Sequence, residues 1–97
     1  MAKLPELDAV IHGQVRLAAL SLLHGAEEAE FTYLRDAIGT TDGNLSVHLG
    51  KLVDAGYVKE TKKFVAKKPK TLYRVTERGR TAFSRYLEAL KALLPPA

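Results

Sequence analysis

The chain contains no cysteine and no tryptophan, and none of its apolar runs approaches the roughly 20 residues that cross a membrane. Without cysteine there are no disulfides and no thiolate metal sites, and the chain fits an oxidising compartment as well as a reducing one. The first residues also lack the basic and then apolar pattern of a secretion signal. A length of 97 residues, 46% of them hydrophobic, fits one small domain over residues 1–97. We therefore expect a single soluble, cytoplasmic domain without a membrane segment.

Signatures of catalysis are missing as well. The sequence has no phosphate-binding glycine loop, no nucleophile motif and no paired carboxylates, and so short a chain has little room for a cleft. The three histidines, His12, His24 and His48, are scattered along the chain, which argues against a metal site. We expect neither an enzyme nor a bound cofactor, and a pH response through one of the histidines is left open.

The clearest local pattern predicts a helix over residues 41–55. Thr41 or Asp42 can cap its start, and Gly56 can adopt the left-handed conformation that ends it. Its apolar stripe consists of leucines at positions 45, 49 and 52, whereas the opposite face is small and polar. A shorter predicted helix over 32–38 precedes it and ends at Gly39. Two helices joined by a tight turn are typical of a helix-turn-helix, whose second helix enters the DNA major groove.

A basic hairpin is predicted directly after this helix. Strands over 57–65 and 71–76 flank a turn-like connection at 66–70. Nine of the 15 basic residues fall between positions 57 and 80, against two acidic ones, so this part carries +7 while the whole chain carries +4. Such a concentration of positive charge indicates a surface for a polyanion.

Long helices are predicted at both ends of the chain, over about 6–24 and 77–94, and Gly13 divides the first into two pieces if it breaks the pattern. Phe31 is a candidate for a minimal first strand. The resulting order, α-α-α-β-β-α, is mainly α with a small β-hairpin wing, which is a winged helix-turn-helix. The terminal helices carry more apolar surface than a three-helix core needs, so we expect them to form a homodimer interface. The candidate interface residues are Leu7, Val10, Ile11, Phe83, Tyr86, Leu87, Leu90 and Leu94.

Three ordered segments resemble small stand-alone winged-helix transcriptional regulators of the MarR/ArsR-like superfamily. They are LDAVIHGQVRL at 7–17, DGNLSVHLGKLVDAGYV at 42–58 and YRVTERGR at 73–80. The resemblance implies a homodimer through the terminal helices, a recognition helix in the major groove and a wing at the adjacent minor groove. The chain departs from the pattern at Val47 and Gly50, where such proteins usually present Arg or Lys, and at Gln14, where Pro is common.

The candidate DNA contacts fall into two groups. In the major groove, Asn44 and Ser46 would read base edges, Val47 would offer apolar contact to a thymine methyl, and Thr41 and Lys51 would touch phosphate. The wing residues that would hold the backbone are Lys62, Lys63, Lys67, Lys68, Lys70 and Arg74.

Two functions remain open from the sequence. One is a dimeric regulator of double-stranded DNA with an unidentified small-molecule effector, if any, whose pocket would lie between the terminal helices by analogy of fold. The other is a winged-helix protein-interaction module with only non-specific DNA binding, which the missing base-reading side chain at Val47 favours.

Overall fold

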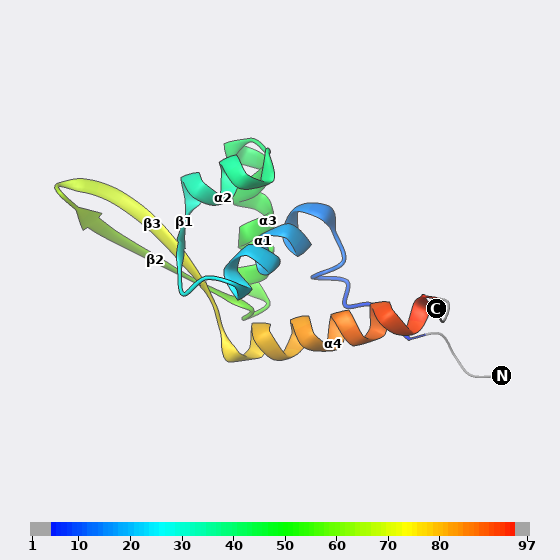
Figure 1. The fold of residues 1–97 in the computed structure, drawn as a ribbon. Helices are drawn as coiled ribbons and strands as arrows, with labels where there is room; N and C mark the ends of the chain where they lie inside the picture. Colours follow the sequence, from blue (N-terminus) through cyan, green and yellow to red (C-terminus); the bar gives the residue numbers. More distant parts are fainter. Residues whose placement is uncertain (1–4, 95–97) are drawn as a thin grey trace.

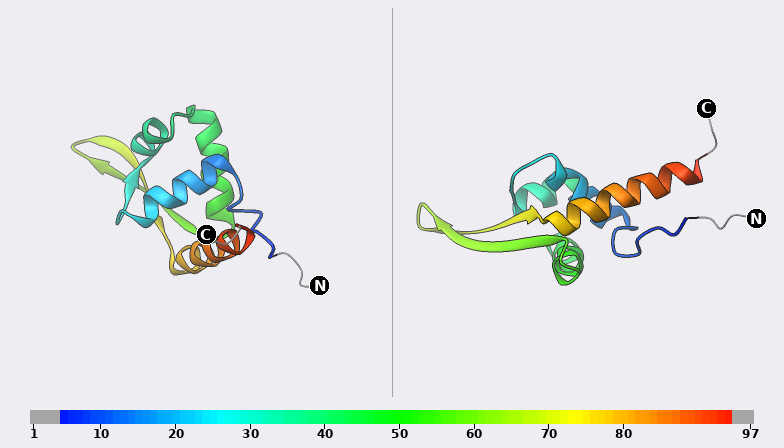
Figure 2. Two further views of the ribbon diagram at one scale, coloured as in Figure 1. Left: turned by 45° about the vertical axis from the view of Figure 1, so that its right-hand side comes forward. Right: turned by 90° about the horizontal axis from the view of Figure 1, so that it is seen from below.

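Four helices and a three-stranded antiparallel sheet make up residues 5–94, the part of the chain that the computed structural model describes. In chain order the elements are α1 (Gln14–His24), β1 (Ala29–Glu30), α2 (Phe31–Ile38), α3 (Asp42–Asp54), β2 (Val58–Val65), β3 (Lys68–Val75) and α4 (Glu77–Leu93). The sheet order is β1-β3-β2. Helices α1 to α3 form one body, from which the β2–β3 hairpin and α4 extend in opposite directions (Figures 1 and 2). The predicted winged-helix fold is confirmed.

Local capping signals set the bounds of α2 and α3. Gly39 closes α2 at φ +78°, and the Thr41 hydroxyl accepts a hydrogen bond from the Asn44 backbone N–H at 3.2 Å. Gly56, at φ +80°, turns the chain from α3 into the hairpin. The three leucines of the predicted stripe on α3 are fully buried, and they meet α1 and α2 in the core. The helix-turn-helix therefore forms where its sequence pattern places it.

The start of α4 is held tightly against the junction between α3 and β2. The Thr76 hydroxyl donates to the Gly56 carbonyl at 2.6 Å, and the Thr76 N–H donates to the Tyr57 carbonyl at 2.9 Å. Gly79 follows on the first turn of α4, where a Cβ atom would lie 2.1 Å from the Tyr57 carbonyl oxygen. Only glycine fits this approach, so the wing base and α4 are fixed together.

The predicted helix over 6–24 is wrong in its first half, because α1 begins only at Gln14. The Asp8 carboxylate accepts a hydrogen bond from the Val10 N–H at 2.8 Å, which folds the segment into a turn. This turn buries Ile11 completely in the core. The Tyr57 hydroxyl donates to the same carboxylate at 2.5 Å, so the segment is tied to the wing base. Gly13 therefore marks the start of α1 and not a break within it.

The hairpin turn is shorter than predicted. Only Ala66 and Lys67 form it, at φ +52° and +65°, which is the backbone of a two-residue hairpin turn. Residues 68–70 belong to β3, and Pro69 lies opposite Phe64 in the part of β3 that β1 does not cover. A missing N–H donor is tolerated there, because the strand has solvent on its other side. The predicted first strand is also displaced, since β1 ends at Glu30 and Phe31 begins α2.

Candidate nucleic-acid interface

All five major-groove candidates predicted from the sequence lie exposed on α3 or at its N-cap. They are Thr41, Asn44, Ser46, Val47 and Lys51. Val47 has 59% of its surface exposed and forms an apolar spot in the middle of this face. Lys51 is the basic side chain on this face of α3, so the helix itself contributes little positive charge to the surface.

Asn44 is already engaged within the chain. Its side-chain amide nitrogen donates to the Thr40 hydroxyl at 2.7 Å, while its backbone N–H donates to the cap residue Thr41. A bidentate contact to adenine needs both polar atoms of the amide. Base reading by Asn44 therefore requires the bond to Thr40 to be exchanged for one to the base, whereas Ser46 makes no such bond within residues 5–94.

Gly43 and Gly50 keep the exposed face of α3 flat. A Cβ atom at either position would meet nothing within 4 Å, and neither residue has a positive φ. The packing and backbone of the chain therefore do not demand glycine there, although each costs about 1 kcal/mol of helix stability relative to alanine.

Two arginines that the sequence patterns did not single out flank α3. Arg35 of α2 donates to Asp36 at 2.9 Å and to Asp42 at 2.8 Å, and these bonds raise its pKa. Arg16 of α1 reaches His48 on α3, where its guanidinium donates to Nδ1 at 2.8 Å. Burial, followed by the charges of Arg16 and Lys51, lowers the pKa of His48 below its ordinary value of 6.5. This histidine is thus kept neutral and connects α1 to the helix-turn-helix.

The strand register divides the hairpin into two faces. The outer face carries odd-numbered residues of β2 and even-numbered residues of β3, and it places Lys59 opposite Arg74 and Lys63 opposite Lys70. Like charges directly opposite one another are destabilising, so this face favours a partner that supplies negative charge.

Part of that negative charge comes from the chain itself. Lys70 pairs with Glu30 at 3.4 Å, and Lys63 pairs with Glu28 at 3.8 Å. The sequence indicated only an exposed acidic connection at Glu28 and Glu30, because their partners lie more than 30 positions further along the chain. Lys62 forms a third pair with Glu60 at 3.7 Å.

The tip of the hairpin differs from its middle. Lys67 in the turn and Lys68 at the start of β3 are exposed and form no ion pair within residues 5–94. Both are therefore available to a phosphate without first leaving an acidic neighbour.

The inner face of the hairpin meets α3. Ser46 of α3 lines one hollow together with Lys62 and Tyr73 of the hairpin. Tyr73 is buried there and donates to Glu60 at 3.1 Å, and burial, followed by the Glu60 charge, raises its pKa to about 12. The exposed face of α3 and the hairpin therefore form one continuous surface.

A family model described as a winged helix DNA-binding domain matches residues 15–94. The chain belongs to this family. Among curated proteins, an uncharacterised protein of Methanocaldococcus jannaschii is 46% identical over 79 residues, which span 80% of this chain and 85% of that protein. The chain also matches the structure of a transcriptional regulator homologue from Pyrococcus horikoshii with 31% identity and a TM-score of 0.81, covering 87% of this chain and 83% of that one.

The MarR-like fold expected from the sequence resemblance is confirmed by a more distant structure. A MarR-family regulator from Silicibacter pomeroyi superposes with a TM-score of 0.67 at 20% identity, over 87% of this chain. The match spans 56% of that regulator. At this identity the likeness shows the shared fold alone.

The predicted dimer residues of this winged-helix chain separate into three groups. Ile11, Phe83 and Tyr86 are buried in the core of the chain itself, where they have almost no surface left for a second copy. Surface remains at the end of α4, where Leu87 and the C-cap residue Leu94 are exposed and Leu90 is half-buried. These three leucines line one shallow groove. Leu7 and Val10 are half-buried against the core.

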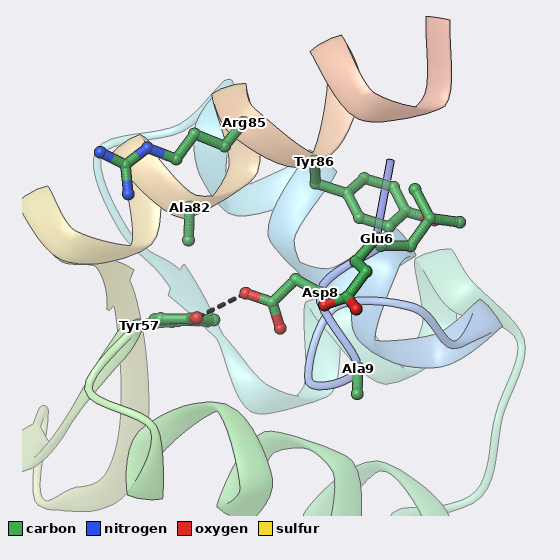
Figure 3. A pocket seen from close by; sticks show the side chains of 8 residues that line it. Glu6, Asp8, Ala9, Tyr57, Ala82, Arg85 and Tyr86 are labelled. Atoms are coloured by element: carbon green, nitrogen blue, oxygen red, sulfur yellow. Dashed lines mark hydrogen bonds between the residues drawn. The ribbon is translucent and has the colours of Figure 1, made fainter. Parts of the chain in front are cut away.

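A hollow of about 430 Å³ lies between the N-terminal segment and α4 (Figure 3). Arg85 and Tyr86 line it from α4, Asp8 lines it from the N-terminal segment, and Tyr57 closes a third side. The hydrogen bond from Tyr57 to Asp8 crosses it and raises the pKa of Tyr57, with burial as the second cause. Through Tyr57 and Asp8, the polar lining of this hollow connects the base of the wing to the N-terminal segment.

The three histidines lie apart in the structure, each with a different partner. His12 Nδ1 is 2.9 Å from the Tyr86 hydroxyl, the tilted rings of His24 and Phe83 have their centroids 5.0 Å apart, and His48 accepts a hydrogen bond from Arg16. Residues 5–94 contain no group of three histidine or acidic side chains that could hold a metal ion. Within the same residues, no helix combines the length and apolar character needed to cross a bilayer.

Proposed function

We propose that this protein is a transcriptional regulator that binds particular double-stranded DNA sequences as a homodimer. The observation that carries the proposal is the continuous surface formed by the exposed face of α3 and the basic hairpin, where Ser46 and Lys62 line one hollow. A flat polar helix beside a positive hairpin complements a major groove and the phosphates next to it. The relative from Pyrococcus horikoshii, described as a transcriptional regulator homologue, supports the same assignment.

In this proposal α3 lies in the major groove and reads bases with few charges. Asn44 and Ser46 face base edges, and Val47 packs against a thymine methyl group. Thr41 and Lys51 contact phosphates, which fixes the position of the helix without specifying sequence. The glycines on this face of α3 let its backbone approach the bases closely.

The homodimer is proposed to form through the end of α4. Leu87, Leu90 and Leu94 supply apolar surface that the chain does not bury on itself. Two copies joined there hold two recognition helices on one face of the duplex, where half-sites lie about 34–36 Å apart.

The test is a selection of bound duplexes from a random-sequence pool at physiological salt, together with the mass in solution by sedimentation equilibrium. We expect an inverted repeat with half-site centres about one helical turn apart, and a mass of two chains. A folded protein that binds duplexes without enriching any sequence contradicts the proposal.

A second function is favoured by one observation, the low charge on α3. Positions 47 and 50 carry Val and Gly in place of Arg or Lys, so α3 lacks the side chains that form strong hydrogen bonds to guanine. Low charge on α3 is expected of a winged helix that binds a protein partner and holds DNA only through the wing. The selection separates the two, because such a module yields salt-sensitive binding and no consensus sequence.

A further inference from the structure

An aromatic side chain stands in solvent at the tip of the hairpin. Phe64, near the end of β2, has 77% of its surface exposed, and its neighbour Val65 has 47%. The register places Phe64 directly opposite Pro69 of β3, so two apolar groups sit side by side on the inner face of the hairpin. From the base to the tip this face passes from the buried Val58 to the open Phe64.

The packing of the chain does not account for this phenylalanine. Full burial of a phenylalanine side chain stabilises the folded state by about 1.5–3 kcal/mol, and Phe64 at the exposed tip does not gain this stabilisation. The cross-strand contact with Pro69 returns at most about 1 kcal/mol. Isolated exposed hydrophobic residues are common on proteins, but Phe64 lies directly opposite Pro69, so the two form a contiguous apolar tip on the inner face.

The charges around the tip indicate what it binds. Lys62 and Lys63 precede Phe64, Lys67 lies in the turn, and Lys68 and Lys70 flank Pro69. An apolar protein groove would have to desolvate these ammonium groups, whereas a nucleic acid offers phosphates for them and bases for the aromatic ring. Proteins that bind the minor groove insert phenylalanine or proline between base pairs in this way, which unstacks the step and bends the duplex.

The direction of the side chain agrees with that partner. Phe64 shares the inner face with Lys62, about 7 Å further along the strand, and Lys62 lines the hollow that Ser46 of α3 also lines. The apolar tip is therefore on the side of the hairpin that continues the surface of α3. Figure 1 shows the tip of the β2–β3 hairpin projecting well beyond the helices.

We propose that Phe64 is an apolar wedge that enters the minor groove beside the α3 contact, partly unstacks one base step and bends the DNA, while Lys67 and Lys68 hold the flanking phosphates. The inference rests on the proposed DNA binding and deepens it. It assigns a sequence preference to the wing, because pyrimidine–purine steps such as TA unstack most readily.

The experiment measures bending and affinity together. A duplex of about 30 base pairs from the selection, with a donor and an acceptor dye at its two ends, reports bending by energy transfer. A fluorescent adenine analogue at the proposed step reports unstacking. We expect the parent to raise both signals and to prefer a TA step there over a GC step.

Substitutions at Phe64 separate a wedge from a charged tip. In Phe64→Ala both signals are lost and affinity falls about tenfold, in line with the loss of one aromatic–base stacking contact, whereas Phe64→Leu keeps part of the bend. Phe64→Lys adds a positive charge, so tighter binding without bending is expected only if the tip acts by charge alone. Val65→Ala, on the opposite face of the same strand, is the matched control and stays close to the parent. Equal melting temperatures show that the variants fold.

The outcomes distinguish this inference from the proposed function. If Phe64→Ala binds and bends the duplex as the parent does, the wedge is refuted while DNA binding stands. If the parent binds no duplex, both fall. If Phe64→Ala leaves DNA binding unchanged but alters sedimentation, the tip is a protein contact and the wedge is again refuted.

Discussion

Replacing Lys67 and Lys68 by alanine tests the wing most directly, because these lysines are free to meet phosphates. Lys62, Lys63 and Lys70 share their charge with Glu60, Glu28 and Glu30, whereas Lys67 and Lys68 form no ion pair in residues 5–94. Both are exposed, so the substitution removes charge without opening the core. We expect the double variant to fold like the parent and to bind all DNA sequences more weakly.

The magnitude follows from counterion release. Each neutralised phosphate contributes about −0.9 to the slope of log K against log salt concentration. With about four phosphates per subunit, a dimer has a slope of roughly −7, and loss of two per subunit leaves roughly −3.5. Over a fourfold rise in salt, the parent then loses about 10⁴ in affinity and the variant about 10².

Fluorescence anisotropy of a labelled duplex at several salt concentrations measures both slopes. Arg85→Ala is the control, since it removes an exposed positive charge from α4, which extends away from the hairpin (Figure 2), and Arg85 does not line the groove of the proposed dimer interface. The control is expected to keep the parental slope. Equal slopes for the parent and the double wing variant would refute the assignment of the wing to DNA phosphates.

Three further predictions follow from contacts within the chain. Replacing Glu28 and Glu30 by glutamine releases two wing lysines, so anisotropy is expected to show severalfold tighter DNA binding at low salt and a steeper slope; unchanged affinity would mean that these pairs do not compete with DNA. Gly79→Ala is expected to lower the free energy of unfolding in urea by about 2 kcal/mol, because overpacking against backbone exceeds the gain in helix propensity, whereas Gly50→Ala raises it by about 1 kcal/mol; equal stabilities would contradict the close packing of α4. Because the pKa of His48 is lowered in the folded state, the unfolded chain binds more protons, and stability present above pH 6.5 is lost as the pH falls below that value; in urea titrations His48→Gln should lose this part of the pH dependence, and an unaltered pH profile would contradict it.

Features that depend on a few adjacent residues could be predicted from the sequence. Thr41 caps α3 and Thr76 caps α4 through bonds that span three positions, and Gly39 and Gly56 adopt the left-handed conformation that ends or follows a helix. The buried stripe of α3 follows from helical spacing alone. The exposed face opposite this stripe, with its five candidate DNA contacts, could be located for the same reason.

The hairpin turn and the N-terminal segment could not be predicted, because local preference does not decide them. Ala66 and Lys67 adopt positive φ without the glycine or asparagine that usually marks such a turn, and the pairing of β2 with β3 imposes it. Leu7 and Ile11 have helical spacing, yet the Asp8 turn and its bond to Tyr57 place this segment irregularly over the core.

Surface and charge were decided only by the tertiary structure. Phe83, Tyr86 and Leu87 share one helical pattern on α4, but the first two are buried in the chain itself and only the third is open to a partner. The pairs that join Glu28 and Glu30 to wing lysines connect positions more than 30 residues apart. The sequence determined which elements form and which residues are basic or apolar, because these depend on neighbours along the chain. Which of those residues remain available to DNA or to a second copy depends on long-range packing, and only the fold settles it.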